Sequence, residues 1–206
     1  MFTGIVQGMA TVTGCTRRDG FMQLELALPP AHSTHLETGA SIAINGTCLT
    51  ITDFDETRVR FDIIDTTLEL TNLGILEVGQ RVNFERAAKI GDEIGGHLMS
   101  GHILCTARVT GVDVSTDNRK IRFDLPAVAA PYLLPKGFAG LNGCSLTLAD
   151  VDSDSFSVSL IPETLRQTTF GQLNIGDCVN LEVDPQTQAI VDTVQRYLAL
   201  QDRSKL

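Results

Sequence analysis

The feature that most constrains the fold is an internal repeat. The hexapeptide NGTCLT at residues 45–50 returns as NGCSLT at residues 142–147, an offset of 97 residues. The same offset, without a gap, matches further residues over about 85 positions. Because chance rarely produces such a register, we predict two tandem copies of one domain. The period is also too long for a solenoid, whose repeat units run from about 20 to 50 residues.

Short apolar runs in each copy have the pattern of β-strands. Every second residue is apolar across residues 24–28 and again across residues 121–125, as in strands with one buried face. Asn-Gly pairs at residues 45–46 and 142–143 are strong signals for tight hairpins. Further β-favouring runs lie at residues 41–44, 48–53 and 59–64, and a short helical turn is expected near residues 66–71. About six short strands in each copy predict a small closed antiparallel barrel.

The tail has no counterpart in copy one. Its apolar residues recur at helical spacing after Pro185, at Ile190, Val191, Val194, Tyr197 and Leu198, which predicts a helix over residues 188–198. We therefore divide the chain into barrels at residues 1–97 and 98–187 and a C-terminal helix at 188–206. The apolar stripe of the helix could pack on its own barrels or join sister helices. Assembly is favoured, because small barrels already fill their own interiors.

Composition excludes several classes of function. The 25 acidic residues outnumber the 16 basic ones, and the net charge of −9 disfavours a nucleic-acid partner. No apolar run approaches the length of a membrane span, and the first residues lack a charged leader region. We therefore expect a cytoplasmic protein without a membrane partner. The five cysteines are widely spaced with no C-x-x-C pair, a pattern that fits neither a disulfide framework nor a zinc site.

Positions at which the copies differ are candidates for chemistry. Cys48 aligns with Ser145, and His102 aligns with Ile5. A thiol could add to an electrophilic carbon or take a proton, and a histidine could act as an acid or base. The alternative for both is structural: a small buried residue in a strand and a hydrogen-bonded histidine. His97 and His102 could form a metal pair, but no Cys or carboxylate cluster completes it, so we expect no metal.

Four segments together resemble the riboflavin synthase family of the alpha-chain type. They are MFTGIV at residues 1–6, the hexapeptide at 45–50, GGHLMSGH at 95–102 and IPETL at 161–165. The resemblance implies two six-stranded antiparallel Greek-key barrels and a C-terminal helix, assembled as a homotrimer. It implies a transferase that needs no cofactor and no metal. In that reaction two 6,7-dimethyl-8-ribityllumazine molecules exchange a four-carbon unit, which gives riboflavin and 5-amino-6-(ribitylamino)uracil. Association with a lumazine synthase is a further partner expectation.

The resemblance also implies a set of site residues. The catalytic set is Cys48, His102, Ser41, Thr147 and Asp184. The substrate-binding set is Gly4, Ile5, Val6, Cys48, Leu49, Thr50, Asp62, Ile63, Ile64, Asp65, Thr66, Thr67, Gly101, His102, Ile103, Lys136, Ser145, Leu146, Thr147, Ile161, Pro162, Glu163, Thr164, Leu165 and Arg166. Lys136 is expected to reach the ligand of a neighbouring subunit. The chain departs from the family pattern at Asp65-Thr66, where a Lys-Glu pair is expected.

Two related pockets suit two similar ligands, but identical pockets could not make one molecule a donor and the other an acceptor. The differences between the copies therefore favour an enzyme. A non-catalytic lumazine or flavin carrier on the same duplicated barrel is the alternative, since a carrier needs one good pocket and no reactive group. A trimeric interaction module is a third hypothesis, and it leaves the polar differences unexplained.

Overall fold

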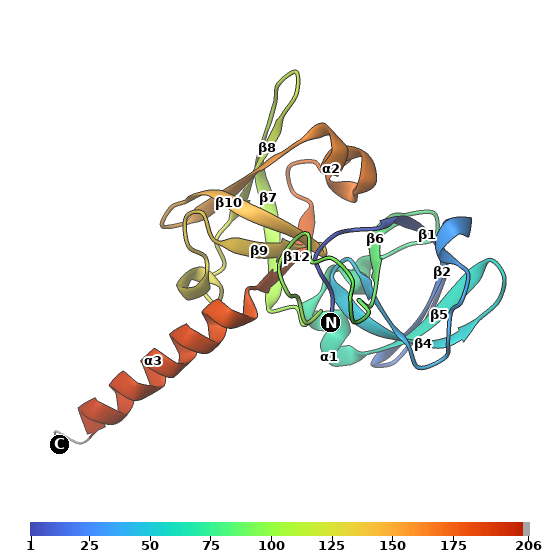
Figure 1. Ribbon diagram of the computed structural model, residues 1–206, viewed down its shortest axis with the longest axis horizontal. Coiled ribbons are helices and arrows are strands. Elements are labelled where there is room, and N and C mark those ends of the chain that lie inside the picture. The colour runs from blue at the N-terminus through green and yellow to red at the C-terminus, as the bar shows by residue number, and fades with distance from the viewer. Residues whose placement is uncertain (204–206) are drawn as a thin grey trace.

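Each copy of the repeat forms a closed six-stranded antiparallel barrel in a computed structural model that describes residues 1–203 (Figure 1). In the first barrel the strands lie in the order β1-β2-β5-β4-β3-β6, and in the second β10-β11-β8-β7-β12-β9. The first barrel comprises β1 (Gly8–Arg18), β2 (Phe21–Ala27), β3 (Ser41–Ile44), β4 (Thr47–Phe54), β5 (Arg58–Ile64) and β6 (Arg81–Arg86). The second comprises β7 (Cys105–Val114), β8 (Arg119–Asp124), β9 (Phe138–Leu141), β10 (Cys144–Val151), β11 (Ser155–Leu160) and β12 (Cys178–Val183).

The helices also repeat, apart from the last. Short helices α1 (Asp65–Leu70) and α2 (Pro162–Gln167) follow the fifth strand of each barrel. Four 3-10 turns complete the connections: η1 (Pro30–His32), η2 (Asn72–Ile75), η3 (Ala130–Tyr132) and η4 (Thr169–Gly171). Both the pairing order and the helix positions confirm the predicted fold of two similar barrels.

Each barrel has its own core, built from the alternation seen in the sequence. Along β2, Met22, Leu24 and Leu26 point inward and are fully buried, and the residues between them are half-buried. The register also shifts at equivalent places in the two barrels, between Val12 and Gly14 and again 97 residues later. Such bulges let a strand bend as the sheet closes on itself. The copies therefore share both side-chain pattern and backbone irregularities.

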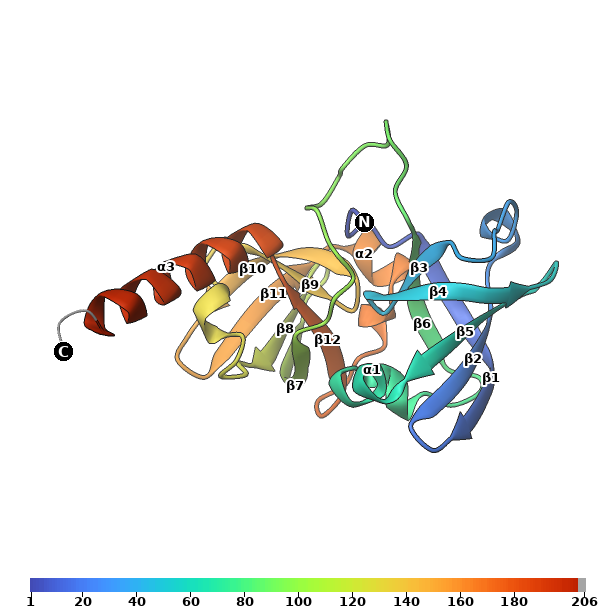
Figure 2. The same cartoon turned by 90° about the horizontal axis from the view of Figure 1, so that it is seen from below.

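The helix α3 (Pro185–Arg203) projects from the second barrel, away from the first (Figure 2). Its residues Ile190, Val194 and Tyr197 are 66%, 51% and 60% exposed, so the apolar stripe does not pack on the barrels of its own chain. Tyr132 hydrogen-bonds to Asp192 near the helix start, at 2.6 Å. Residues 204–206 of the predicted C-terminal helix lie outside the described residues. Within residues 1–203, no helix is long and apolar enough to cross a membrane.

The two predicted Asn-Gly hairpin turns meet back to back between the barrels. Both turns use left-handed backbone, with φ of 44° and 80° at Asn45 and Gly46 and of 43° and 80° at Asn142 and Gly143, as two-residue hairpin loops require. A Cβ added to Gly46 would lie 2.6 Å from the amide nitrogen of Gly143. Glycine is therefore required at the closest backbone approach of the two barrels.

A buried asparagine network joins the barrels around these turns. Asn83 donates to the carbonyl of Asn142 at 2.9 Å, and Asn180, its repeat equivalent, donates to the carbonyl of Asn45 at 2.9 Å. Asn72 adds a bond to the Asn142 side chain at 3.0 Å. Buried amides lose their hydration, so each of them needs such a partner. The two-fold pattern of bonds fixes one barrel against the other.

Two segments cross between the barrels. The first crossing segment, residues 1–6, precedes β1, and the second crossing segment, residues 98–104, precedes β7. They pair at an isolated bridge between Phe2 and Met99. Buried Glu85 accepts bonds from the amide and hydroxyl of Thr3 at 2.6 and 2.8 Å. Its equivalent, Glu182, holds Ser100 in the same way at 2.6 and 2.8 Å.

The crossing is reciprocal at the backbone. The carbonyl of Gly4, which belongs to the first copy, accepts a bond from the amide of Ser145 in β10 at 2.8 Å. The carbonyl of Gly101 accepts a bond from the amide of Cys48 in β4 at 2.8 Å. Each barrel is therefore completed at one edge by the segment that precedes the first strand of the other. Candidate residues from both halves of the sequence meet at these two edges.

Candidate active site

A cavity of about 460 Å³ opens where the first crossing segment lies on the second barrel. We call it the C-terminal pocket. Its lining comes from the crossing segment, the start of β10 and one side of α2, at Gly4, Ile5, Val6, Gln7, Cys144, Ser145, Leu146, Glu163, Thr164, Gln167 and Thr168. Seven of these residues belong to the predicted substrate-binding set. The pocket is of the size that suits a small organic ligand.

One wall of the C-terminal pocket carries a serine–histidine pair. The hydroxyl of Ser145 lies 2.6 Å from Nδ1 of His97, and the imidazole stacks on the ring of Phe138 with centroids 5.5 Å apart. His97 is only 9% exposed. Burial lowers the pKa of His97, and the charge of Asp184 opposes this in part. Burial therefore favours the neutral form of the imidazole, which is hydrogen-bonded to the serine.

The corresponding edge of the first barrel holds Cys48 and the second crossing segment. We call Cys48, Leu49 and residues 101–103 the N-terminal site. A Cβ on Gly101 would lie 2.6 Å from the Cβ of Cys48, so the segment lies directly on the cysteine. His102 follows at once, and its side chain is exposed. The fold therefore places the backbone next to His102 against Cys48, the other residue at which sequence analysis predicts chemistry.

Burial raises the thiol pKa of three of the other four cysteines. All five are free thiols. Burial raises the pKa of Cys144 to about 12, with a contribution from Glu85, and raises that of Cys105 to about 11. Burial also raises the pKa of Cys15. These three thiols stay protonated near neutral pH, and protonated thiols are poor nucleophiles.

Comparison with known proteins gives the family. The model of the lumazine binding domain matches twice, over residues 3–87 and 100–184. The riboflavin synthase of Escherichia coli (strain K12) is 50% identical over 205 residues, covering 99% of this chain and 96% of the relative. That of Chlamydia pneumoniae is 44% identical, covering 97% and 98%. The chain belongs to the riboflavin synthase family.

The solved structures to which the chain is similar include a ligand-binding protein. LumP complexed with 6,7-dimethyl-8-(1'-D-ribityl)lumazine superposes with a TM-score of 0.81 at 28% identity, covering 89% of this chain and 99% of LumP. LumP complexed with riboflavin gives a TM-score of 0.84 at 27% identity with the same coverage. The two family matches are offset by 97 residues, which confirms the predicted resemblance and the repeat.

In this riboflavin synthase family member, the equivalent helices α1 and α2 carry different charges. Glu163 on α2 pairs with Arg166 and accepts a bond from Gln167 at 3.1 Å. Bonds from Gln167 and Arg166 lower the pKa of Glu163. Copy one has Thr66 at the equivalent place and Glu69 in place of the arginine. Copy one therefore lacks the carboxylate because of the departure at Asp65-Thr66, and it lacks the cation of the pair because of Glu69.

Exposed apolar side chains lie just before both short helices and in the first crossing segment. Ile64 and Ile161 directly precede α1 and α2 and are 58% and 63% exposed, and Ile5 is 49% exposed. Flat aromatic ligands bind through such apolar contacts. Ile63 differs from these predicted wall residues, because its side chain lies in the core of the first barrel. Only its backbone is available to a ligand.

Ser41, Thr147 and Lys136 are predicted residues that lie outside the lining of the C-terminal pocket. Ser41 lines a separate cavity of about 470 Å³ beside Arg86. Thr147 is exposed and pairs in register with Phe138. Lys136 is exposed with a φ of 67°, a left-handed conformation that non-glycine residues seldom adopt. Its repeat equivalent is a glycine, so only copy two carries a strained lysine here.

Asp184 has a structural task at the start of α3. Its carboxylate accepts bonds from the amide and hydroxyl of Thr187 at 3.0 and 2.7 Å, as a helix cap does. Partial burial acts to raise the pKa of Asp184, but the bonds from Thr187 and Gln186 outweigh it, so the net shift is downward. Its charge also reaches His97. A catalytic role and a capping role are compatible at this position.

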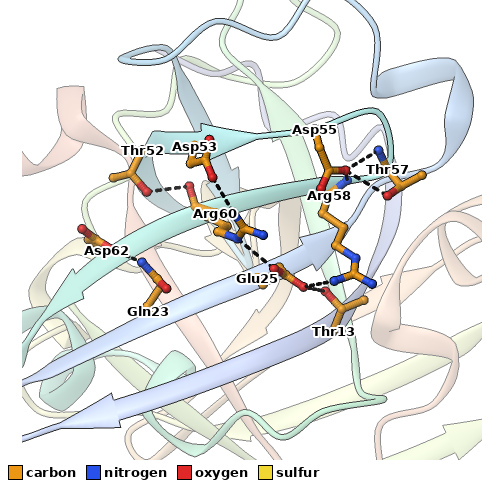
Figure 3. A network of polar contacts seen from close by, with 10 residues as sticks. All are labelled: Thr13, Gln23, Glu25, Thr52, Asp53, Asp55, Thr57, Arg58, Arg60 and Asp62. Carbon is orange, nitrogen blue, oxygen red and sulfur yellow. Dashed lines mark hydrogen bonds and ion pairs between the residues drawn. The ribbon is translucent and has the colours of Figure 1, made fainter.

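Asp62 belongs to a polar network on the outside of the first barrel (Figure 3). It accepts a bond from Gln23 at 3.2 Å. In the same figure Glu25 accepts bonds from Thr13, Arg58 and Arg60 at 2.9, 3.1 and 2.8 Å. These contacts link the strands β1, β2 and β5 and provide a structural role for the polar residues. Among residues 1–203, no three His, Cys, Asp or Glu side chains gather as a metal ion would require.

Two features of the site escaped sequence analysis. His97 was considered only with His102, yet its partner is Ser145. The buried carboxylates Glu85 and Glu182 hold the crossing segments, and burial raises the pKa of both. The repeat offered a signal for the glutamates, because acids recur 97 residues apart within strands. No comparable signal existed for His97, because its partner lies 48 residues away.

Proposed function

We propose that this chain is a riboflavin synthase that converts two molecules of 6,7-dimethyl-8-ribityllumazine into riboflavin and 5-amino-6-(ribitylamino)uracil. The observation that carries the proposal is full-length identity of 50% to a riboflavin synthase, combined with two related but unequal ligand sites in one chain. The four carbons lost by one molecule are gained by the other, so the reaction requires no outside oxidant. Unequal sites allow one ligand to act as donor and the other as acceptor.

The proposed chemistry uses the N-terminal site. A methyl group on the lumazine ring must lose a proton, and a ring carbon must accept a nucleophile. His102 serves as the acid or base for the methyl proton. Cys48 adds to the ring carbon or positions the water that does so. Support comes from the backbone bond of 2.8 Å that seats the segment of His102 on Cys48.

The remaining predicted residues orient the ligands. Ser41 and Thr147 hold the ring or the attacking water, and Lys136 and Asp184 form the polar rim. Residues 4–6 and 101–103 offer backbone groups to the ring edge. Lys136 reaches the ligand of a neighbouring subunit, and the reacting pair of ligands spans two protomers. The exposed, left-handed position of Lys136 supports a role outside its own barrel.

A non-catalytic carrier is the competing function, because LumP with bound lumazine has the same fold. Incubation of the chain with 6,7-dimethyl-8-ribityllumazine distinguishes the two. An enzyme yields riboflavin and the diaminopyrimidine in equal amounts, measured by chromatography and riboflavin fluorescence. A carrier returns the lumazine unchanged. Binding without turnover by the folded wild-type chain would reject the enzyme and leave the carrier.

The proposed assembly is a homotrimer held largely by α3. The exposed stripe of Ile190, Val194 and Tyr197 supports an interface between helices. A chain that ends at Asp184 should give smaller species by light scattering. Substitution of the exposed polar Gln195 by Ala in the full chain serves as the control and should leave the trimer intact. A truncated chain that still formed trimers would contradict the role of α3. Cytoplasmic location remains a prediction from the sequence, and association with a lumazine synthase remains a prediction of the family resemblance.

A further inference from the structure

His97 does not belong to the predicted catalytic or binding set, yet it is one of the most enclosed polar side chains near a ligand site. It reaches the C-terminal pocket only through Ser145, at 2.6 Å. Its ring stacks on Phe138, and the residue is only 9% exposed. Its Nε2 is buried and has no hydrogen-bond partner among residues 1–203. A buried polar ring that makes a single bond calls for an explanation.

The unpartnered Nε2 indicates which nitrogen carries the proton. A neutral imidazole has one N–H donor and one acceptor nitrogen. A buried N–H without a partner is rarer than a buried acceptor without one, so the proton belongs on Nδ1. His97 then donates to the oxygen of Ser145. The serine keeps its own hydroxyl proton free to donate elsewhere.

That free proton belongs to a residue that lines the C-terminal pocket. The first barrel has no serine hydroxyl held by a histidine at this position. Its equivalent residue is Cys48, and no side chain within residues 1–203 hydrogen-bonds to the Cys48 thiol. A thiol is also a weaker hydrogen-bond donor than a hydroxyl. The two sites therefore differ in one directed donor as well as in charge.

We propose that His97 is a positioning residue that fixes the Ser145 hydroxyl as a donor to a carbonyl or hydroxyl oxygen of the ligand in the C-terminal pocket. This inference rests on the proposed function, because the ligand oxygen is that of a lumazine or flavin. His97 then contributes to the difference in affinity between the two sites. A ligand held through an oxygen acceptor is bound more tightly by the second barrel than by the first.

The test compares two substitutions of His97 in the full chain. His97→Phe keeps the stack on Phe138 but loses the donor. His97→Asn keeps an amide donor near the place of Nδ1. Riboflavin and 6,7-dimethyl-8-ribityllumazine are titrated by fluorescence, and the C-terminal pocket is identified as the class of site that Ser145→Ala weakens. Circular dichroism and light scattering establish that each variant is folded and assembled. His35→Asn, at an exposed left-handed position that Asn tolerates, is the control.

The expected result is a roughly fivefold to tenfold weaker C-terminal pocket in His97→Phe, the loss of about one hydrogen bond. His97→Asn should bind within about twofold of the wild type, because the bond to Ser145 is restored. The double variant His97→Phe/Ser145→Ala should bind no more weakly than Ser145→Ala alone, since both remove the same interaction.

Three results would overturn the proposal. They are wild-type affinity in His97→Phe, equally weak binding by the Phe and Asn variants, and additive losses in the double variant. The first two would make His97 a packing residue only. In each case the wild-type chain still binds and converts lumazine, so the proposed function stands. A folded wild-type chain that bound neither probe would instead reject the proposed function and this inference with it.

Discussion

The two barrels agree at the paired turns and glutamate clamps that hold them together, and they differ at positions that meet a ligand. Asn45 and Asn142, the paired Asn-Gly turns, and the clamps Glu85 and Glu182 repeat at one offset and make equivalent bonds. At the pocket edges, by contrast, Cys48 stands opposite Ser145, and Thr66 stands opposite Glu163. Duplication therefore supplied one scaffold twice, and substitution at the edges made the two sites unequal. That pattern is what a reaction between two identical molecules demands.

The largest expected effect comes from removing chemistry at the N-terminal site. General acid–base catalysis typically contributes about 100- to 10,000-fold, so His102→Gln should reduce turnover by a factor in that range. Cys48→Ser should also be slow, and less so if the thiol only positions water. Steady-state formation of riboflavin measures both.

Cys105→Ser is the matched control for these variants. Its thiol lies in β7, outside the lining of the C-terminal pocket, and burial raises its pKa to about 11, so the variant should turn over near the wild-type rate. If folded trimers of His102→Gln and Cys48→Ser both turned over at the wild-type rate, the assignment of chemistry to the N-terminal site would be wrong.

The second effect tests the shared scaffold, where the copies should respond alike. Gly46→Ala and Gly143→Ala each place a Cβ within 2.6 and 2.8 Å of the opposite turn's backbone at a φ of 80°. We expect each to lower the free energy of unfolding by about 3 kcal/mol, through strain and a steric clash. Urea denaturation monitored by circular dichroism measures the loss.

The control glycines share the backbone conformation but have open space around them. Gly79 and Gly176 have φ of 93° and 100°, and an added Cβ would meet nothing within 4 Å. Alanine there should cost about 1 kcal/mol, the price of left-handed backbone alone. A large difference in the free energy of unfolding between Gly46→Ala and Gly143→Ala would show that the two turns do not contribute equally to the interface.

Sequence analysis could reach the fold because its signals are local or periodic. The strand predicted at residues 41–44 is β3 as observed, and the runs at 48–53 and 59–64 lie inside β4 and β5 with ends displaced by one residue. The terminal helix is longer than the predicted 188–198, because it begins at Pro185, after the cap provided by Asp184, and continues to Arg203. The internal repeat then predicts that each copy forms its own six-stranded barrel.

The site was harder to predict because it depends on contacts between distant residues. Gly4 meets Ser145, and Gly101 meets Cys48, only because the crossing segments exchange barrels. No pattern in the sequence indicates which edge a coil segment joins. The bond from His97 to Ser145 was missed for the same reason. Positions of repeat asymmetry identified candidate residues, but they could not give the pairs.

The third expected effect comes from exchanging charges between α1 and α2. Glu163→Thr should weaken ligand binding in the C-terminal pocket by roughly threefold to tenfold, because a hydrogen-bond acceptor at the pocket wall is lost. Thr66→Glu combined with Glu69→Arg should give the N-terminal site the pair seen on α2. Fluorescence titration with riboflavin measures the two classes of site.

Thr66→Glu alone is the informative control for that exchange. Its carboxylate would lie one helical turn from Glu69, and like charges at this spacing repel. The single variant should therefore gain less affinity than the double variant. If the two sites of the wild-type chain had equal affinity and neither exchange changed it, then α1 and α2 would not contribute to a difference in ligand binding between the barrels.

The smallest expected effect separates the two roles of Asp184, whose equivalent in copy one is Ala87. Asp184→Ala removes the cap of α3 and should lower the free energy of unfolding by about 1 kcal/mol at pH 7. The pKa of Asp184 is lowered in the folded chain. Its contribution is therefore present above the unfolded pKa, near about 3.9, and is lost as the pH falls through the folded value.

Asp184→Asn distinguishes capping from charge, because asparagine caps helices about as well as aspartate but does not titrate. In urea melts this variant should keep most of the stability at pH 7 and lose less of it between pH 5 and pH 2 than the wild type. Turnover gives the second readout. If Asp184 only caps α3, the Asn variant should form riboflavin at the wild-type rate. A folded, stable Asn variant with slow turnover would instead show that copy two uses this carboxylate in the reaction, which is the sharper difference between the barrels.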